Sequence, residues 1–171
     1  LWIVAIVNAF NWADGLDGLA SGLFIISTLG FLLKFTYANQ NILLMAILIS
    51  LIGTNLGFIK HNFFPSKIFM GDGGSFFLGS IIAFFSLNQN LFGSSYDISL
   101  NYMMSKFLFV GLPFIDMIYV VFSRIMAKKS IFYPDRIHFH YKLIDSGISH
   151  TNAVLICYLI GLLFLLLGLF L

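Results

Sequence analysis

Charged residues are scarce in this chain of 171 residues, and glutamate is absent altogether. Lysine, arginine and aspartate together supply 9% of the residues, whereas hydrophobic residues supply 60% and the mean hydropathy is +0.98. These values exclude an ordinary soluble domain and indicate an integral membrane protein. The net charge of +2 is too small to indicate nucleic-acid binding, so no nucleic-acid partner is expected.

Cysteine occurs once, as Cys157 within an apolar run, which excludes a disulfide framework. The sequence begins at Leu1 without methionine, and the residues that follow have neither the basic flank nor the cleavage site of a signal peptide. We therefore expect residues 1–171 to form a single integral membrane domain, the C-terminal portion of a longer protein whose N-terminal helices are missing.

Long apolar runs predict an all-α fold, a polytopic bundle of transmembrane helices. A hydrocarbon core of about 30 Å requires about 20 apolar residues per helix. After a partial helix that ends near Phe10, five runs predict spans over residues 19–33, 42–59, 76–87, 102–125 and 151–171. Turn-forming residues occupy 39–41 and 88–101. Asp116 is predicted to lie in or near the hydrocarbon, beside a local bend at Gly111 and Pro113, with a structural or a functional partner.

Three polar loops, at residues 11–17, 60–75 and 124–150, lie on one membrane face if each span crosses once. Of the nine lysines and arginines, only Lys34 and Lys106 are left for the opposite face. Because positive residues concentrate on the cytoplasmic side, the motif loops are predicted to be cytoplasmic in a multi-pass protein of the inner membrane.

Asp72 stands in the glycine-rich segment 70–75, between two apolar runs. Glycines at 71, 73 and 74 let the backbone approach an anion closely, and Ser75 is expected to cap the next helix, whose N-terminus favours phosphate. An aspartate beside an anion requires a bridging cation, and hard oxygen ligands favour Mg²⁺, with Mn²⁺ as the alternative. The structural alternative is a glycine-rich turn that Asp72 caps.

An earlier polar segment repeats at a spacing of three residues, as Asn8, Asn11, Asp14 and Asp17. On a helix these four side chains form one polar stripe, and the two aspartates can converge on a ligand. Capping of the helix, with Gly18 as the terminator, is the structural alternative. A calcium loop is disfavoured because the terminal bidentate glutamate is absent.

His138 and His140 lie two residues apart in a basic loop that also contains Arg136. Zinc binding is geometrically feasible, but no other soft ligand is near in sequence. Phosphate binding by these cationic groups is favoured, and a solvated basic loop that only sets the topology is the alternative. His61 and His150 have no partner in the pattern and are assigned to the membrane interface.

Three motifs together resemble the polyprenyl-phosphate N-acetylhexosamine-1-phosphate transferase family, and they occur in that family's order. They are NAFNWADGLDGLA at 8–20, the segment from Asn62 through KIFMGD to Ser75, and Asp135-Arg136 with His138 and His140. The resemblance covers nearly the whole chain. It implies Mg²⁺-dependent transfer of N-acetylhexosamine 1-phosphate from a UDP-sugar to polyprenyl phosphate, such as undecaprenyl phosphate. The products are a polyprenyl-diphospho-sugar, which initiates synthesis of a cell-envelope glycan, and UMP.

The resemblance also implies roles for individual residues. Catalysis is assigned to Asp72, Asp14, Asp17, His138 and His140. Substrate binding is assigned to Asn8, Asn11, Asn62, Phe69 and Arg136. The metal ligands are Asp72 and Asn11. The expected partners are a UDP-N-acetylhexosamine, a polyprenyl phosphate lipid and the membrane, and a homodimer is left open.

Two departures from the family pattern concern the histidine motif and the start of the chain. The family continues its motif with another histidine and often arginine, where this chain has Tyr141 and Lys142. The family's adjacent catalytic aspartates would precede Leu1, so we expect residues 1–171 alone to be inactive. The alternatives are a transporter, whose polar groups would gather at the membrane midplane, and a family relative without catalytic activity.

Overall fold

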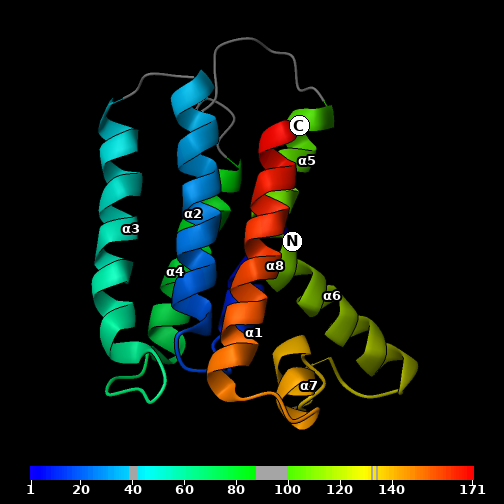
Figure 1. Ribbon diagram of the computed structural model, residues 1–171. Helices are drawn as coiled ribbons and strands as arrows, with labels where there is room; N and C mark the ends of the chain where they lie inside the picture. Colours follow the sequence, from blue (N-terminus) through cyan, green and yellow to red (C-terminus); the bar gives the residue numbers. More distant parts are fainter. Residues whose placement is uncertain (39–41, 88–99, 132, 134) are drawn as a thin grey trace.

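The computed structural model describes residues 1–171 apart from 39–41, 88–99, 132 and 134, and its described part is entirely helical or irregular (Figure 1). The turn predicted at 39–41 and most of the loop predicted at 88–101 lie outside the described residues. The helices are α1 (Trp2–Ala13), α2 (Leu19–Ala38), α3 (Ile42–Asn62), α4 (Gly71–Leu87), α5 (Leu100–Phe109), α6 (Gly111–Met126), α7 (Phe139–Asp145) and α8 (His150–Phe170).

The predicted all-α membrane bundle is confirmed, with fewer full-length spans than expected. Within the described ranges, α2, α3 and α8 are each long and apolar enough to cross a membrane. Helices α5 and α6 would make a fourth crossing only if the bent pair counts as one span, and α1 and α4 are shorter apolar helices. The chain is therefore a multi-pass membrane protein.

Helix α2 occupies the centre of the bundle, where most of it is buried, whereas α3 is largely exposed along its apolar length. Helices α1 and α4 pack closely against each other. Gly79 makes this approach possible, because a Cβ there would lie only 2.7 Å from the Cα of Val7 in α1. The close contact fixes the polar ends of α1 and α4 side by side.

The span predicted over residues 102–125 is broken, and its two halves meet at an angle of 81°. An unbroken helix would lose one backbone hydrogen bond at Pro113 and crowd its ring against the preceding turn. A new helix that begins at Gly111 places Pro113 in the first turn, where no N–H is needed. The local bend predicted at Gly111 and Pro113 is confirmed, and Asp116 lies just after it in α6.

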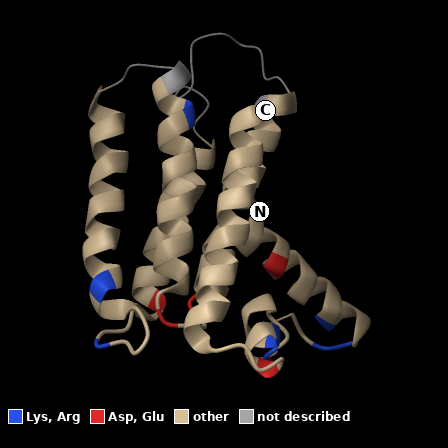
Figure 2. Cartoon of the chain, in the orientation of Figure 1, with Lys and Arg blue, Asp and Glu red and all other residues tan. Residues whose placement is uncertain are grey.

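The three polar loops lie at one end of the bundle, as the counting of spans predicts (Figures 1 and 2). The backbone N–H of Gly18 donates to Asn62 Oδ1 at 3.1 Å, and the Tyr141 hydroxyl donates to the Gly15 carbonyl at 3.2 Å. These two contacts join the first loop to the second and to the third. Residues far apart in sequence thus form one polar region.

Candidate active site

Asn11 and Asp72 come together where the C-terminal end of α1 meets the first turn of α4. The Asn11 side-chain amide donates to Asp72 Oδ1 and to Ser75 Oγ, each at 3.0 Å. Because α4 begins at Gly71, where φ is +66°, Ser75 lies buried inside the helix and does not cap it as expected. Asp72 in this first turn has the charge that a helix N-terminus favours.

Asp14 carries the clearest electrostatic signature of the site. It is half-buried, and burial together with the charges of Asp72 and Asp17 raises its pKa to about 6. In the described part of the chain, no ion pair reaches any of these three carboxylates. We call Asn11, Asp14, Asp17 and Asp72 the acidic wall, three neighbouring carboxylates and one amide, and no cationic side chain among the described residues pairs with these carboxylates.

The polar stripe predicted from Asn8 to Asp17 is interrupted, because α1 ends at Ala13. Asp14 is the C-terminal cap residue of that helix, and Asp17 lies in the turn that follows. The Asn8 amide donates to the Val4 carbonyl of its own helix at 2.7 Å, so the structure does not join it to Asp72.

Asp17 and Asn62 connect the first two loops. Asp17 Oδ2 accepts from the Ser66 N–H at 3.2 Å. Asn62 is buried, and while its Oδ1 accepts from Gly18, its amide donates to the Ile68 carbonyl at 2.9 Å. These contacts shape the loop that leads to Phe69, whose side chain is 80% exposed. The substrate-binding roles of Asn62 and Phe69 stay predictions.

His150 has a role in these loops that its sequence position does not reveal. Its Nε2 accepts from the Asp17 backbone N–H at 3.3 Å, and its ring stacks on Phe64 with centroids 4.4 Å apart. It therefore has specific protein partners in addition to the interfacial position assigned to it. The partners are separated by 133 positions in sequence, so no local pattern could have indicated the bond.

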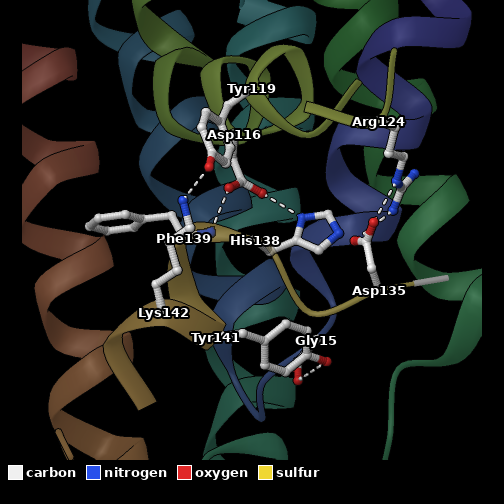
Figure 3. A network of polar contacts seen from close by, with 9 residues as sticks. All are labelled: Gly15, Asp116, Tyr119, Arg124, Asp135, His138, Phe139, Tyr141 and Lys142. Carbon is white, nitrogen blue, oxygen red and sulfur yellow. Dashed lines mark hydrogen bonds and ion pairs between the residues drawn. The ribbon is translucent and has the colours of Figure 1, made fainter. Parts of the chain in front are cut away.

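His138 is held between α6 and α1. Its Nδ1 lies 2.7 Å from Asp116 Oδ2, and its ring meets the Trp12 ring edge-on with centroids 5.6 Å apart. Asp116 Oδ1 also accepts from the Phe139 N–H at 2.7 Å (Figure 3). Asp116, for which the sequence left the partner open, thus contacts the histidine motif directly.

A buried ion pair closes the same loop. Arg124 donates to both carboxylate oxygens of Asp135, at 3.0 and 3.1 Å, and its guanidinium lies over the Trp12 ring at 4.8 Å from the centroid. The hydrogen bonds and charge of Arg124 lower the pKa of Asp135. This pair anchors the motif residues that follow Asp135.

His140 lies beneath Gly15 of the first loop. It is buried, and burial lowers its pKa to about 4, so the imidazole is neutral at physiological pH. Its Nε2 has no hydrogen-bond partner among the described residues, and a Cβ on Gly15 would come 2.4 Å from that atom. A glycine at position 15 is therefore required for the two loops to meet.

Arg136 is the most accessible of the predicted substrate-binding cations. Its side chain is 65% exposed, pairs with Asp145 at 3.4 Å and lies over the Tyr141 ring at 4.9 Å. Tyr141, at the position of a family histidine, also donates to Gly15. We call Asp116, Asp135, His138, His140 and Tyr141 the histidine wall, which contacts the first loop at Gly15, between Asp14 and Asp17 of the acidic wall.

The carboxylate and amide oxygens of the acidic wall suit a hard cation whose remaining coordination positions are filled by other ligands. Within the described ranges, no three histidine, cysteine or acidic side chains are close enough to hold a metal by themselves, which also disfavours zinc at His138 and His140. Carboxylate and amide oxygens that leave positions for phosphate and water fit Mg²⁺. The uncompensated charges at Asp14 and Asp72 favour such a cation.

Fold and site together define a multi-pass membrane protein with a polar, aspartate-rich site at one end of its helix bundle. A family model described as Glycosyl transferase family 4 matches residues 1–90, more than half of the chain. The chain belongs to this family, which confirms the resemblance seen in its motifs.

Three relatives illustrate the match. A Bacillus subtilis (strain 168) protein, named a probable undecaprenyl-phosphate N-acetylglucosaminyl 1-phosphate transferase, is 40% identical over 96% of this chain and 44% of its own length. The Mycobacterium leprae decaprenyl-phosphate N-acetylglucosaminephosphotransferase is 38% identical over 91% of this chain and 43% of its own length. The phospho-N-acetylmuramoyl-pentapeptide-transferase of Staphylococcus aureus (strain JH9) is 36% identical over 98% of this chain and 49% of its own length. The chain thus spans about half the length of these relatives or less.

Proposed function

We propose that the whole protein transfers N-acetylhexosamine 1-phosphate from a UDP-sugar to polyprenyl phosphate. An oxygen of the lipid phosphate attacks the sugar-linked phosphorus, the bond from that phosphorus to the bridging oxygen breaks, and UMP leaves with the electron pair. The product is a polyprenyl-diphospho-sugar that starts a cell-envelope glycan. The activities named for the three relatives support this reaction class; two of the names give N-acetylglucosamine and the third gives N-acetylmuramoyl-pentapeptide.

The acidic wall is the observation that carries the proposal. Three carboxylates gather at one end of the bundle, beside an amide, with no cationic partner of their own in the described chain. Phosphoryl transfer depends mainly on positioning and on charge stabilisation, and a bridging cation meets both needs. The position of the site suits an enzyme that takes one substrate from water and another from lipid.

Asp72 and Asn11 would hold Mg²⁺, whose binding would replace the hydrogen bond between them. When bound, the ion would offset charge on the diphosphate and on the departing UMP. Asp14 and Asp17 orient the nucleotide-sugar side of the site, together with Asn62 and Phe69. Arg136, His138 and His140 engage the phosphate or the sugar. The excess of lysine and arginine at this end supports a cytoplasmic site in the inner membrane.

The decisive experiment uses the full-length gene product in membranes, with UDP-N-acetylglucosamine and polyprenyl phosphate, and follows UMP release with and without Mg²⁺. The Asp72→Asn variant should lose at least about 100-fold in turnover, because the amide removes a charged metal ligand. Asp145→Asn makes the same change at an exposed aspartate outside the acidic wall and should keep turnover within about twofold.

Wild-type turnover in Asp72→Asn would show that the metal assignment is wrong. UMP release that requires polyprenyl phosphate and is lost with EDTA supports the proposed transfer. Flux of the nucleotide sugar across vesicles without UMP release would instead identify a transporter. If neither flux nor UMP release is observed, the result would favour a family relative without catalytic activity.

A further inference from the structure

Asp116 makes two contacts that fix the start of the histidine motif. Its Oδ2 lies 2.7 Å from His138 Nδ1, and its Oδ1 accepts from the Phe139 N–H at the same distance. Only 11% of the Asp116 side chain and 7% of the His138 side chain are exposed. Figure 3 shows the carboxylate of α6 directed at both groups. Because both Asp116 oxygens are engaged and shielded, this arrangement restrains the position of the His138 ring and the protonation of its Nδ1.

The chemistry of the carboxylate decides where the imidazole proton lies. An ionised carboxylate only accepts hydrogen bonds, so His138 must donate through Nδ1–H. In a neutral imidazole this leaves Nε2 without a proton, as an acceptor. The Trp12 ring edge-on to His138 and the His140 ring stacked at 5.4 Å restrict rotation of the ring. The protein thus selects both the tautomer and the orientation of His138.

We propose that Asp116 is a positioning residue that holds His138 as the Nδ1–H tautomer and directs its Nε2 acceptor to a donor group of the substrate. This inference rests on the proposed transferase function for its kinetic consequence, but its structural content can be measured without any activity. Asp116 itself need not touch the substrate, because it acts through His138.

The two oxygens of Asp116 separate this role from a purely structural one. In Asp116→Asn, the amide oxygen still accepts from the Phe139 N–H, which can only donate. The amide NH₂ then faces His138 Nδ1, which must become the acceptor, so the ring proton moves to Nε2. The start of α7 keeps its hydrogen bond while the tautomer of His138 inverts.

The first test is the ¹⁵N chemical shifts of the His138 ring in the full-length protein, labelled at histidine and assigned by loss of the signals in His138→Gln. Unsubstituted protein should show Nδ1–H, and Asp116→Asn should show Nε2–H with an unchanged unfolding midpoint. An Nε2–H ring in the unsubstituted protein would overturn the inference, and that measurement does not require Asp116→Asn to fold or UMP to be released.

The second test is a double-mutant cycle on UMP release. Asp116→Asn should lower kcat roughly 100-fold with little change in KM, as expected when a wrong tautomer is presented. In a His138→Gln background the same substitution should add no more than about twofold, because its target is already gone. An equal loss in both backgrounds would assign Asp116 a role independent of His138 and overturn the inference. Asp145→Asn is the matched control in both backgrounds. If unsubstituted protein releases no UMP, the proposed function fails while the ¹⁵N test still decides the tautomer.

Discussion

The acidic wall and the histidine wall differ in whether their carboxylates have partners within the protein. In the histidine wall, Asp116 pairs with His138 and Asp135 pairs with Arg124, and both pairs are largely buried. In the acidic wall, Asp14 has a raised pKa because it is buried near two other negative charges. In the first arrangement both carboxylates have partners within the described protein, whereas the second favours a positive ligand. We infer that the histidine wall orients and the acidic wall binds.

The two walls also differ in what holds them in place. The Arg124–Asp135 ion pair and the Asp116–His138 hydrogen bond fix the histidine wall to α6, while the acidic wall depends on the backbone contact of α1 with α4 at Gly79. Substitutions can therefore disturb one wall and spare the other. The following predictions use that difference, from the largest expected effect to the smallest.

Arg124→Met should weaken the histidine wall most, because it leaves Asp135 charged, shielded and unpaired. We expect a loss of about 3–5 kcal/mol in the free energy of unfolding, measured by titration with SDS in mixed micelles. Adding Asp135→Asn to that variant should restore a large part of the loss. Arg136→Met breaks an exposed pair of the same loop and should cost no more than about 1 kcal/mol. Equal losses in the two single variants would contradict this distinction.

Gly79→Ala should disturb the acidic wall, because the added Cβ would meet the α1 backbone at 2.7 Å and push α1 from α4. We expect a loss of roughly 1–3 kcal/mol in unfolding free energy, together with lower affinity for Mg²⁺. Gly57→Ala is the matched control in exposed α3, where a Cβ meets nothing within 4 Å. It should be neutral or stabilise by up to about 1 kcal/mol. Unchanged Mg²⁺ affinity in Gly79→Ala would separate the metal site from this helix contact.

Asp14 should give the smallest effect, a pH dependence of the stability of the metal-free protein. Its folded pKa of about 6 exceeds the ordinary value of 3.8, so the folded state holds the proton more tightly than the unfolded state. The contribution of protonated Asp14 to the stability of the folded state is fully present below pH 4 and is lost as pH rises through about 6. With EDTA present, the unfolding midpoint of unsubstituted protein relative to Asp14→Asn should fall over this range. A constant difference from pH 4 to pH 7 would refute the assignment.

Much of the site's location could be predicted because it follows from counting spans and charges. An even number of predicted crossings separates the loops at 11–17, 60–75 and 124–150, and the lysines and arginines concentrate at the same end. Neither argument needs an accurate helix boundary. The convergence of Asn11 with Asp72 depends on Gly79 as well, whose role in bringing two helices together has no periodic signal.

The connections between the loops could not be predicted, because they join residues without any shared local pattern. Asp116 belongs to the histidine wall only because Pro113 fits the first turn of a new helix and α6 leaves the direction of α5. Asn62 is predicted from the sequence to bind substrate, and only the structure shows that its side chain also joins Gly18 to Ile68. Such assignments require a three-dimensional arrangement.

The contacts of α8 with the first loop have a consequence for the order of biosynthesis. The Tyr158 hydroxyl donates to the Gly18 carbonyl at 2.6 Å, and His150 at the start of the same helix accepts from Asp17. A ribosome makes the aspartates of the first loop long before it makes these partners. The nascent protein therefore carries these acidic residues through insertion without the two contacts from α8, which form only after α8 has been made.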